Sequence, residues 1–165
     1  MISKEKEFFQ ACSEGNLQKV KNLYKSKSQQ PLNINYGNPH NQLNTGLSIA
    51  CEKGLIDLVG FLLLLPEIDV NKGNKHGETP LVIACSRGNS VIVKMLFASG
   101  REIERSQVKM VSHGGGCWRD KYRSWMAARV AREEGFEEIA ELVEEYVGNR
   151  RETILKLRRE LSKIF

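Results

Sequence analysis

Long apolar stretches and a leader-like N-terminus are both missing from this 165-residue sequence. The longest apolar run, LVGFLLLLP at 58–66, stops at Pro66 after eight apolar or glycine residues, whereas a membrane-spanning helix needs about 20. The first residues, MISKEKEFF, carry charges where a signal peptide has its apolar stretch. We therefore expect no membrane association and no secretion by way of a signal peptide. The expected location is the cytoplasm, with the nucleus as the second compartment.

Catalytic and metal-binding patterns are equally scarce. Histidine occurs only as His40, His76 and His113, and no G-x-S-x-G motif supplies a nucleophilic serine. His113 and Cys117 lie close together in HGGGC, but two ligands do not make a zinc site and no second pair follows at a suitable spacing. The glycines of that run also lack the lysine and hydroxyl of a phosphate-binding loop. We predict a protein without catalytic residues, bound metal or cofactor.

The four cysteines do not form the pattern of a disulfide framework. Cys12, Cys51 and Cys85 each follow an alanine directly, in the related phrases ACSEGN, ACEKGL and ACSRGN. A position that recurs in this way accepts a small apolar side chain, and free cysteine behaves as one. Reduced thiols of this kind are typical of intracellular proteins.

Charge is distributed in blocks. The net charge is +5, but residues 101–132 contain eight basic and three acidic side chains, whereas residues 133–145 contain seven glutamates and no base. Such blocks carry more information about surfaces than the total does.

An internal repeat organises most of the chain. In GETPLVIACSRGNSVIVKMLF at 77–97, Thr79 can cap a short helix with Pro80 at its first position, and apolar residues at three- and four-residue intervals then form a second helix. TGLSIACEKGLIDLVGFLL repeats this pattern from Thr45, 34 residues upstream. FFQACSEGNLQKVKNLY at 8–24 is a further copy, and MAARVAREEGFEEIAELV at 126–143 is a degenerate one. Neither helix of such a unit can bury its apolar side alone, so the copies must stack.

A period in the low thirties with T-P-L-x-x-A opening a helix pair resembles the ankyrin repeat, and the resemblance covers residues 4 to about 147. It implies an all-α fold, a solenoid of helix pairs with β-turn fingers between them. We expect a single domain over 1–165, with repeats at about 4–32, 33–67, 68–100 and 101–148. A C-terminal helix at 149–165 has an apolar stripe of Ile154, Leu157, Leu161 and Ile164, and it should dock over the open end of the stack as a cap.

The sequence departs from the family pattern in its turns. Gly46 replaces the family's proline, which predicts a slightly weaker helix start, and the first finger is about two residues longer than the next. Ser48 and Val82 replace a histidine that usually bonds turn backbone in this family. We expect these turns to be held instead by the side chains of Asn71, Asn74 and Thr79.

The largest departure is an insertion. The repeat alanines Ala84 and Ala131 are 47 residues apart, 13 more than the preceding spacing of 34. A long finger at 105–124 is therefore predicted between the third and fourth repeats. It combines three consecutive glycines, aromatic residues and basic residues, and long structured loops are often functional.

The resemblance implies a non-catalytic protein–protein interaction module. In this family, partners usually bind a concave face formed by finger tips and first helices, and aromatic and arginine side chains are frequent anchors. For the two tryptophans, packing against neighbouring repeats stays an alternative. We expect a monomer that binds a protein partner, and transferring the face position by position gives Tyr36, His40, Asn44, Lys53, Lys75, His76, Glu78, Arg87, Trp118, Arg119, Tyr122 and Trp125.

Nucleic-acid or phosphate binding through the basic aromatic finger at 101–125 is the alternative function. Its basic residues are Arg101, Arg105, Lys109, Arg119, Lys121 and Arg123, and Trp118 and Tyr122 could stack on bases. The adjacent acidic block at 133–145 should repel phosphates, so this alternative ranks behind protein binding. An enzyme ranks third and would require activity that depends on His76 or His113.

Overall fold

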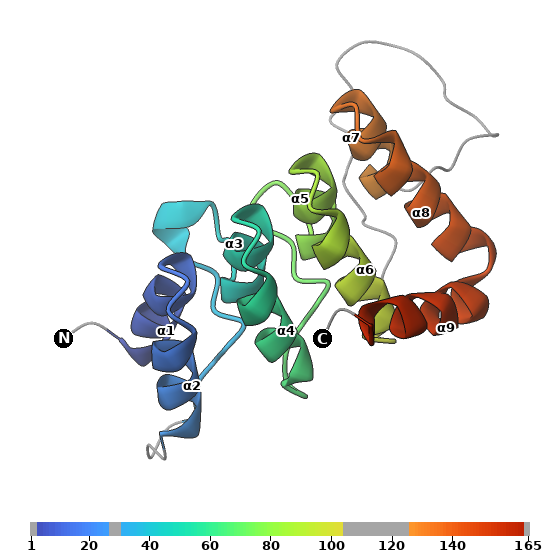
Figure 1. The fold of residues 1–165 in the computed structure, drawn as a ribbon. Coiled ribbons are helices and arrows are strands. Elements are labelled where there is room, and N and C mark those ends of the chain that lie inside the picture. The colour runs from blue at the N-terminus through green and yellow to red at the C-terminus, as the bar shows by residue number, and fades with distance from the viewer. Residues whose placement is uncertain (1–2, 27–30, 104–125, 164–165) are drawn as a thin grey trace, which may run out of the picture.

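The structure is a computed structural model that describes residues 3–26, 31–103 and 126–163, and these residues form a curved row of stacked helix pairs (Figure 1). The predicted all-α solenoid is confirmed. The helices are α1 (Lys4–Ser13), α2 (Leu17–Lys25), α3 (Gly46–Glu52), α4 (Ile56–Leu64), α5 (Pro80–Ser86), α6 (Ser90–Ala98), α7 (Met126–Glu133), α8 (Glu137–Gly148) and α9 (Arg150–Leu161), with a short 3-10 turn at Pro39–Asn41.

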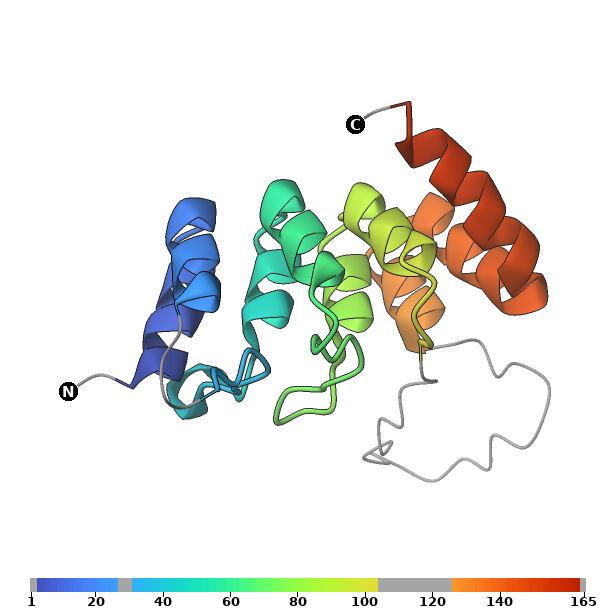
Figure 2. The ribbon, with the colours of Figure 1, turned by 90° about the horizontal axis from the view of Figure 1, so that it is seen from below.

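The first helix of each pair packs on the first helix of the next, so α1, α3, α5 and α7 form an inner row. The second helices α2, α4 and α6 lie behind it, and the segments that precede α3 and α5 project to the opposite side (Figure 2). We call residues 31–45 the first finger and residues 66–79 the second finger. The surface bounded by these fingers and the inner row is the concave face.

The repeat motif explains where the helices begin and end. The hydroxyls of Thr45 and Thr79 accept hydrogen bonds from the backbone N–H groups of Ser48 and Val82, and Pro80 occupies the first position of α5. Glycines follow the first helices, and at 15, 54, 88 and 135 they have φ angles between 69° and 83°. That left-handed conformation turns the chain back sharply at little steric cost to glycine.

Small side chains allow the inner row to pack closely. The four repeat alanines, at 11, 50, 84 and 131, are completely buried. Gly46 belongs to the same close approach, because a Cβ atom at this position would lie 2.9 Å from Cys12 Sγ. The sequence suggested a weakened helix start at Gly46, and the structure gives the glycine a packing role between α1 and α3.

The third and fourth repeats meet through stacked aromatic rings. Phe97 of α6 and Tyr146 of α8 lie with ring centroids 4.0 Å apart and an interplanar angle of 9°, and both side chains are almost fully buried. This contact ties the degenerate last repeat to the rest of the stack.

Helix α9 packs against both α6 and α8 (Figure 1). Leu157 is buried in this contact, while Ile154 and Leu161 of the predicted stripe are half-buried and Ile164 lies outside the described residues. Arg158 Nε donates to the carbonyl oxygen of Ala98 at 2.8 Å, which binds α9 to the end of α6. The predicted helix therefore covers part of the third repeat as well as the fourth.

None of the helices in the described part of the chain is long and apolar enough to cross a membrane. The predicted finger at 105–124 lies outside the described residues. The description of the chain stops at Ile103 and resumes at Met126.

Candidate functional site

The first finger has an unusual backbone at its tip. Asn38 and Asn44 form an antiparallel bridge, and between them Gln42 and Leu43 have φ angles of 52° and 61°. Residues other than glycine rarely adopt this left-handed backbone conformation, which costs about 1 kcal/mol or more per residue. The bend leaves Leu43 45% exposed beside the concave face.

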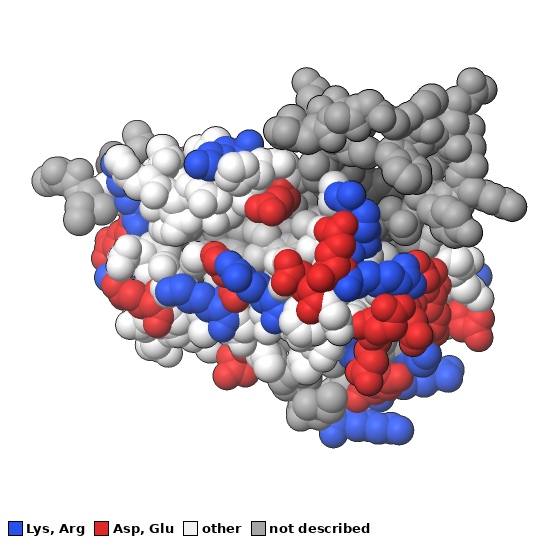
Figure 3. Space-filling model, turned by 90° about the horizontal axis from the view of Figure 1, so that it is seen from above, with Lys and Arg blue, Asp and Glu red and all other residues white. Residues whose placement is uncertain are grey.

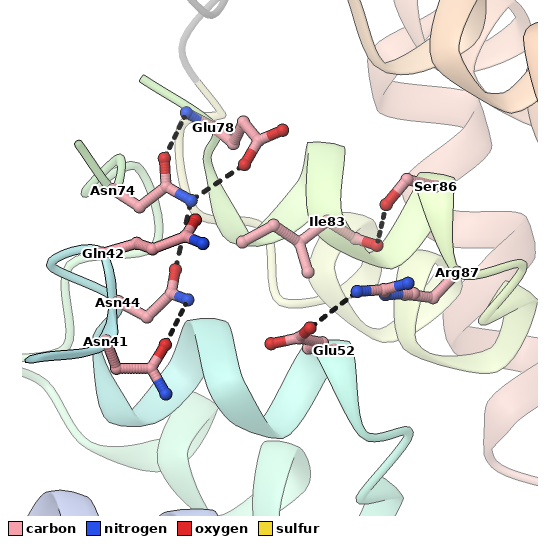
Figure 4. A pocket seen from close by; sticks show the side chains of 9 residues that line it. All are labelled: Asn41, Gln42, Asn44, Glu52, Asn74, Glu78, Ile83, Ser86 and Arg87. Atoms are coloured by element: carbon pink, nitrogen blue, oxygen red, sulfur yellow. Dashed lines mark hydrogen bonds and ion pairs between the residues drawn. The ribbon is translucent and has the colours of Figure 1, made fainter. Parts of the chain in front are cut away.

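A chain of asparagine side chains connects the two fingers (Figure 4). Asn44 Nδ2 donates to Asn41 Oδ1 at 3.0 Å, and Asn74 Nδ2 donates to Asn44 Oδ1 at 3.2 Å. Asn74 Nδ2 also donates to Glu78 Oε2 at 2.8 Å, while its Oδ1 accepts the backbone N–H groups of His76 and Glu78. The predicted role of Asn74 in holding its turn is thus visible as four hydrogen bonds made by one side chain.

A backbone hydrogen bond also joins the two fingers. The N–H of Lys75 donates to the carbonyl oxygen of Gln42 at 2.7 Å. Further back, Asn71 Nδ2 donates to the carbonyl oxygen of Glu102 at 2.7 Å, as its predicted turn-holding role requires. Together these bonds fix each finger to the segment that follows it in the stack.

A polar hollow of about 180 Å³ opens between the fingers and helices α3 and α5. We call it the finger pocket, and Figure 4 shows the side chains that line it. On its helix side, Arg87 Nη2 lies 2.6 Å from Glu52 Oε1, with these side chains 56% and 31% exposed. The pocket is lined by Asn41, Gln42, Asn44, Glu52, Asn74, Glu78, Ile83, Ser86 and Arg87.

The structure brings several of the residues transferred from the family pattern to this region. Glu78 and Arg87 line the finger pocket, and Lys75 and His76 are exposed at the tip of the second finger. His40 is exposed on the first finger, where Tyr36 is half-buried. Lys53 is exposed on the loop after α3, but its Nζ donates to the carbonyl oxygen of Ser13 at 2.6 Å, which places it toward the first repeat.

Asn44 differs from the expectation of an exposed contact residue. Its side chain is only 5% exposed, and its amide is shared between Asn41 and Asn74. It therefore shapes the pocket wall from within the fold. Trp118, Arg119, Tyr122 and Trp125 lie outside the described residues.

Transfer from the family pattern overlooked Asn41, Gln42 and Leu43. The available signal was the extra length of the first finger, to which these residues belong. Length alone did not reveal that the added residues adopt left-handed backbone and form one wall of a pocket.

The basic residue Arg101, assigned above to the alternative nucleic-acid surface, is already engaged. Its guanidinium donates to the carbonyl oxygens of Leu65 at 2.6 Å, Ile68 at 3.2 Å and Pro66 at 3.3 Å. These carbonyls follow the end of α4, where backbone oxygens lack helical partners. Arg101 therefore closes the second repeat onto the third.

Acidic side chains gather over the fourth repeat (Figure 3). Arg132 partly neutralises them, because its guanidinium donates to Glu144 at 2.6 and 2.9 Å and to Glu137 at 2.9 Å. The hydrogen bonds from Arg132 lower the pKa of Glu144. The exposed glutamates of this patch are Glu133, Glu134, Glu137, Glu138, Glu141, Glu144 and Glu145.

The recurring cysteines lie in the inner row and do not line the finger pocket. Cys12, Cys51 and Cys85 are completely buried free thiols, as the filler interpretation predicted. Burial raises the pKa of Cys12 and of Cys85 to about 12, and burial together with the nearby Cys85 raises the pKa of Cys51. Among the described residues, no three potential ligands of the histidine, cysteine or carboxylate type come together in a metal-binding cluster.

We predict that these three thiols resist modification in the folded protein. In a Cys117→Ser variant, reaction with a disulfide reagent near neutral pH should be more than about a hundredfold slower than in denaturant, because thiolate and access are both lacking. Absorbance of the released thiol measures the rate. Folded and unfolded samples that react at similar rates would contradict this burial.

The raised thiol pKa values also predict a pH dependence of stability. Because the unfolded chain loses these thiol protons at lower pH than the folded chain, the free energy of unfolding should fall as the pH rises above about 8.5.

Comparison with known proteins identifies the family to which these repeats belong. A family model of ankyrin repeats, in three copies, matches residues 8–107, which is more than half of the chain and ends before α7. The ankyrin repeat protein YahD of Escherichia coli (strain K12) is 36% identical over 99 residues, covering 59% of this chain and 44% of that protein. The SMC5-SMC6 complex localization factor protein 1 of Bos taurus is 34% identical over 71 residues, 43% of this chain and 7% of the relative. The photoreceptor ankyrin repeat protein of Homo sapiens is 38% identical over 53 residues, 32% and 12% respectively. The matches thus span less than half the length of these relatives.

Proposed function

The chain belongs to the ankyrin repeat family, and on that premise we propose that it is a non-catalytic module that binds a partner protein on its concave face. Ankyrin repeats generally mediate protein–protein interaction, and the finer assignment concerns this particular surface. The observation that carries it is the finger pocket, where side chains from two fingers and two helices surround one hollow that opens to the surface.

The rigidity of the concave face supports this proposal. The asparagine network and the Lys75–Gln42 backbone bond hold the two fingers in one geometry. A preorganised surface loses less conformational entropy on binding, and more of the contact energy then appears as affinity. The exposed Leu43 at its edge adds apolar area of the kind that interfaces bury.

Affinity capture from a native lysate tests the proposal with matched charge changes. One variant changes Leu43 to aspartate and Lys75 to glutamate on the concave face, and the control makes the same changes at Leu64 and Lys25, which are exposed on α4 and α2. We expect the wild type and the control to recover the same partner, identified by mass spectrometry, and the concave-face variant to recover it at least about tenfold less well. Equal recovery by both variants would place binding elsewhere.

The salt dependence of the same capture distinguishes protein binding from the alternative function, nucleic-acid binding. Protein binding through polar and apolar contacts should weaken only modestly with added salt. Steep loss of capture with salt, accompanied by nucleic acid in the eluate, would instead favour nucleic-acid binding.

A further inference from the structure

We propose that the finger pocket receives a lysine or arginine side chain of the partner. This inference rests on the proposed function, because it states the chemistry by which the concave face would recognise its partner.

The pocket has room for a single long side chain. Its volume of about 180 Å³ would otherwise hold several water molecules of about 30 Å³ each. The lining comes from the first finger, α3, the second finger and α5, so an entering side chain would be surrounded on several sides. Figure 4 shows Glu52 on α3 and Glu78 on the second finger as parts of this lining.

The charge of the lining favours a cation. It includes the two carboxylates of Glu52 and Glu78 and the guanidinium of Arg87, which leaves one negative charge in excess. Arg87 pairs with Glu52 through Oε1 alone. Within the part of the chain that the structure describes, Glu52 Oε2 and Glu78 Oε1 accept no hydrogen bond.

The carboxylate oxygens that remain open favour a charged donor. Glu52 Oε2 and Glu78 Oε1 keep their acceptor capacity, whereas Asn74 Nδ2 already donates to Asn44 and Glu78. The amides of Asn41 and Gln42 offer donors and acceptors alike, so they do not select between ligands. Lysine and arginine carry only donors at their charged ends, and hydrogen bonds between a charged donor and a carboxylate are stronger than those of neutral groups.

The apolar part of the lining suits the rest of such a side chain. Ile83 lines the pocket among the polar groups (Figure 4). A lysine or arginine buries its aliphatic stem against apolar surface while its charged end is hydrogen-bonded. Ile83 offers that surface.

Nuclear magnetic resonance titration of the full ¹⁵N-labelled chain tests this assignment. The probes are N-acetyl-lysine amide and N-acetyl-arginine amide, and N-acetyl-norleucine amide is the matched control with a similar stem and no charge. Up to about 50 mM, where a complex with a dissociation constant of about 10 mM is mostly formed, both cationic probes should give saturable shifts at 41–44, 74–78 and 86–87. The norleucine probe should not.

Two substitutions that change the charge of the pocket in opposite directions provide a second test. Glu78→Gln keeps an acceptor for Asn74 and should weaken cation binding about fivefold, whereas Arg87→Gln releases Glu52 and should strengthen it by a similar factor. Glu138→Gln, an equal charge change on the exposed face of α8, should have no effect. Absence of saturable shifts, equal shifts with norleucine amide, or unchanged binding in Glu78→Gln would overturn the inference.

The outcome is separable from that of the capture experiment. A negative titration would remove the cation site and leave the concave face as a protein-binding surface. A positive titration combined with capture that ignores the concave-face substitutions would keep the cation site and remove the proposed function.

Discussion

Replacing Phe97 with alanine is expected to lower the free energy of unfolding by about 3–5 kcal/mol, the usual cost of removing a fully buried phenylalanine ring. Phe97 has no exposed surface, and it stacks on Tyr146 with the ring centroids 4.0 Å apart. Its loss would leave a cavity in the third repeat and also remove the aromatic contact with the fourth. Because each repeat is stabilised by its neighbours, damage at this junction should also loosen α8 and α9.

Urea denaturation followed by circular dichroism measures this effect. Leu64→Ala is the matched control, because Leu64 lies in the equivalent outer helix of the preceding repeat and is 80% exposed. It should change stability by less than about 0.5 kcal/mol. Phe97→Leu, which retains most of the apolar volume, should fall between the two. A Phe97→Ala protein as stable as the Leu64→Ala protein would mean that the third and fourth repeats are not joined in this way.

The repeat period allowed most of this fold to be predicted. Helix starts at Thr45 and Thr79 were visible because a hydroxyl cap can be recognised within a few residues. The burial of the cysteines was visible because the same position recurs in three copies. Repetition provides several independent views of one structural position, and local chemistry then explains what that position requires.

Close approaches between repeats were harder to predict. Gly46 looked like a poor substitute for proline when its own helix was considered alone, but the spacing that matters is the one between α1 and α3. Arg101 was similarly grouped with other basic residues, although it binds carbonyl oxygens at the end of α4. In both cases the deciding contact lies about 35 residues away in the sequence.

The candidate site was only partly predictable for the same reason. Glu78 and Arg87 could be placed on the concave face by their position in the repeat. The pocket itself depends on how the longer first finger folds against the second, and no periodic pattern describes that finger. Asn44 illustrates the difference, since repeat position suggested a surface residue and tertiary hydrogen bonding buries it.

Replacing Asn74 with alanine tests how strongly the two fingers depend on each other. The substitution removes hydrogen bonds to Asn44 and Glu78 and leaves the backbone N–H groups of His76 and Glu78 without their acceptor. Asn74 is 8% exposed and Asn44 is 5% exposed, so water cannot easily replace these partners. At about 1–3 kcal/mol for each poorly compensated buried group, a total loss of about 3 kcal/mol is expected.

The distribution of the effect matters as much as its size. If the asparagine chain couples the fingers, Asn74→Ala should increase amide hydrogen exchange at 38–44 in the first finger as well as at 74–78 in its own. His76→Ala is the matched control, because its exposed side chain lies two residues away on the same turn. It should leave exchange and stability nearly unchanged. Faster exchange confined to the second finger would show that Asn74 supports only its own turn, and that the backbone bond from Lys75 to Gln42 is sufficient to hold the first finger in place.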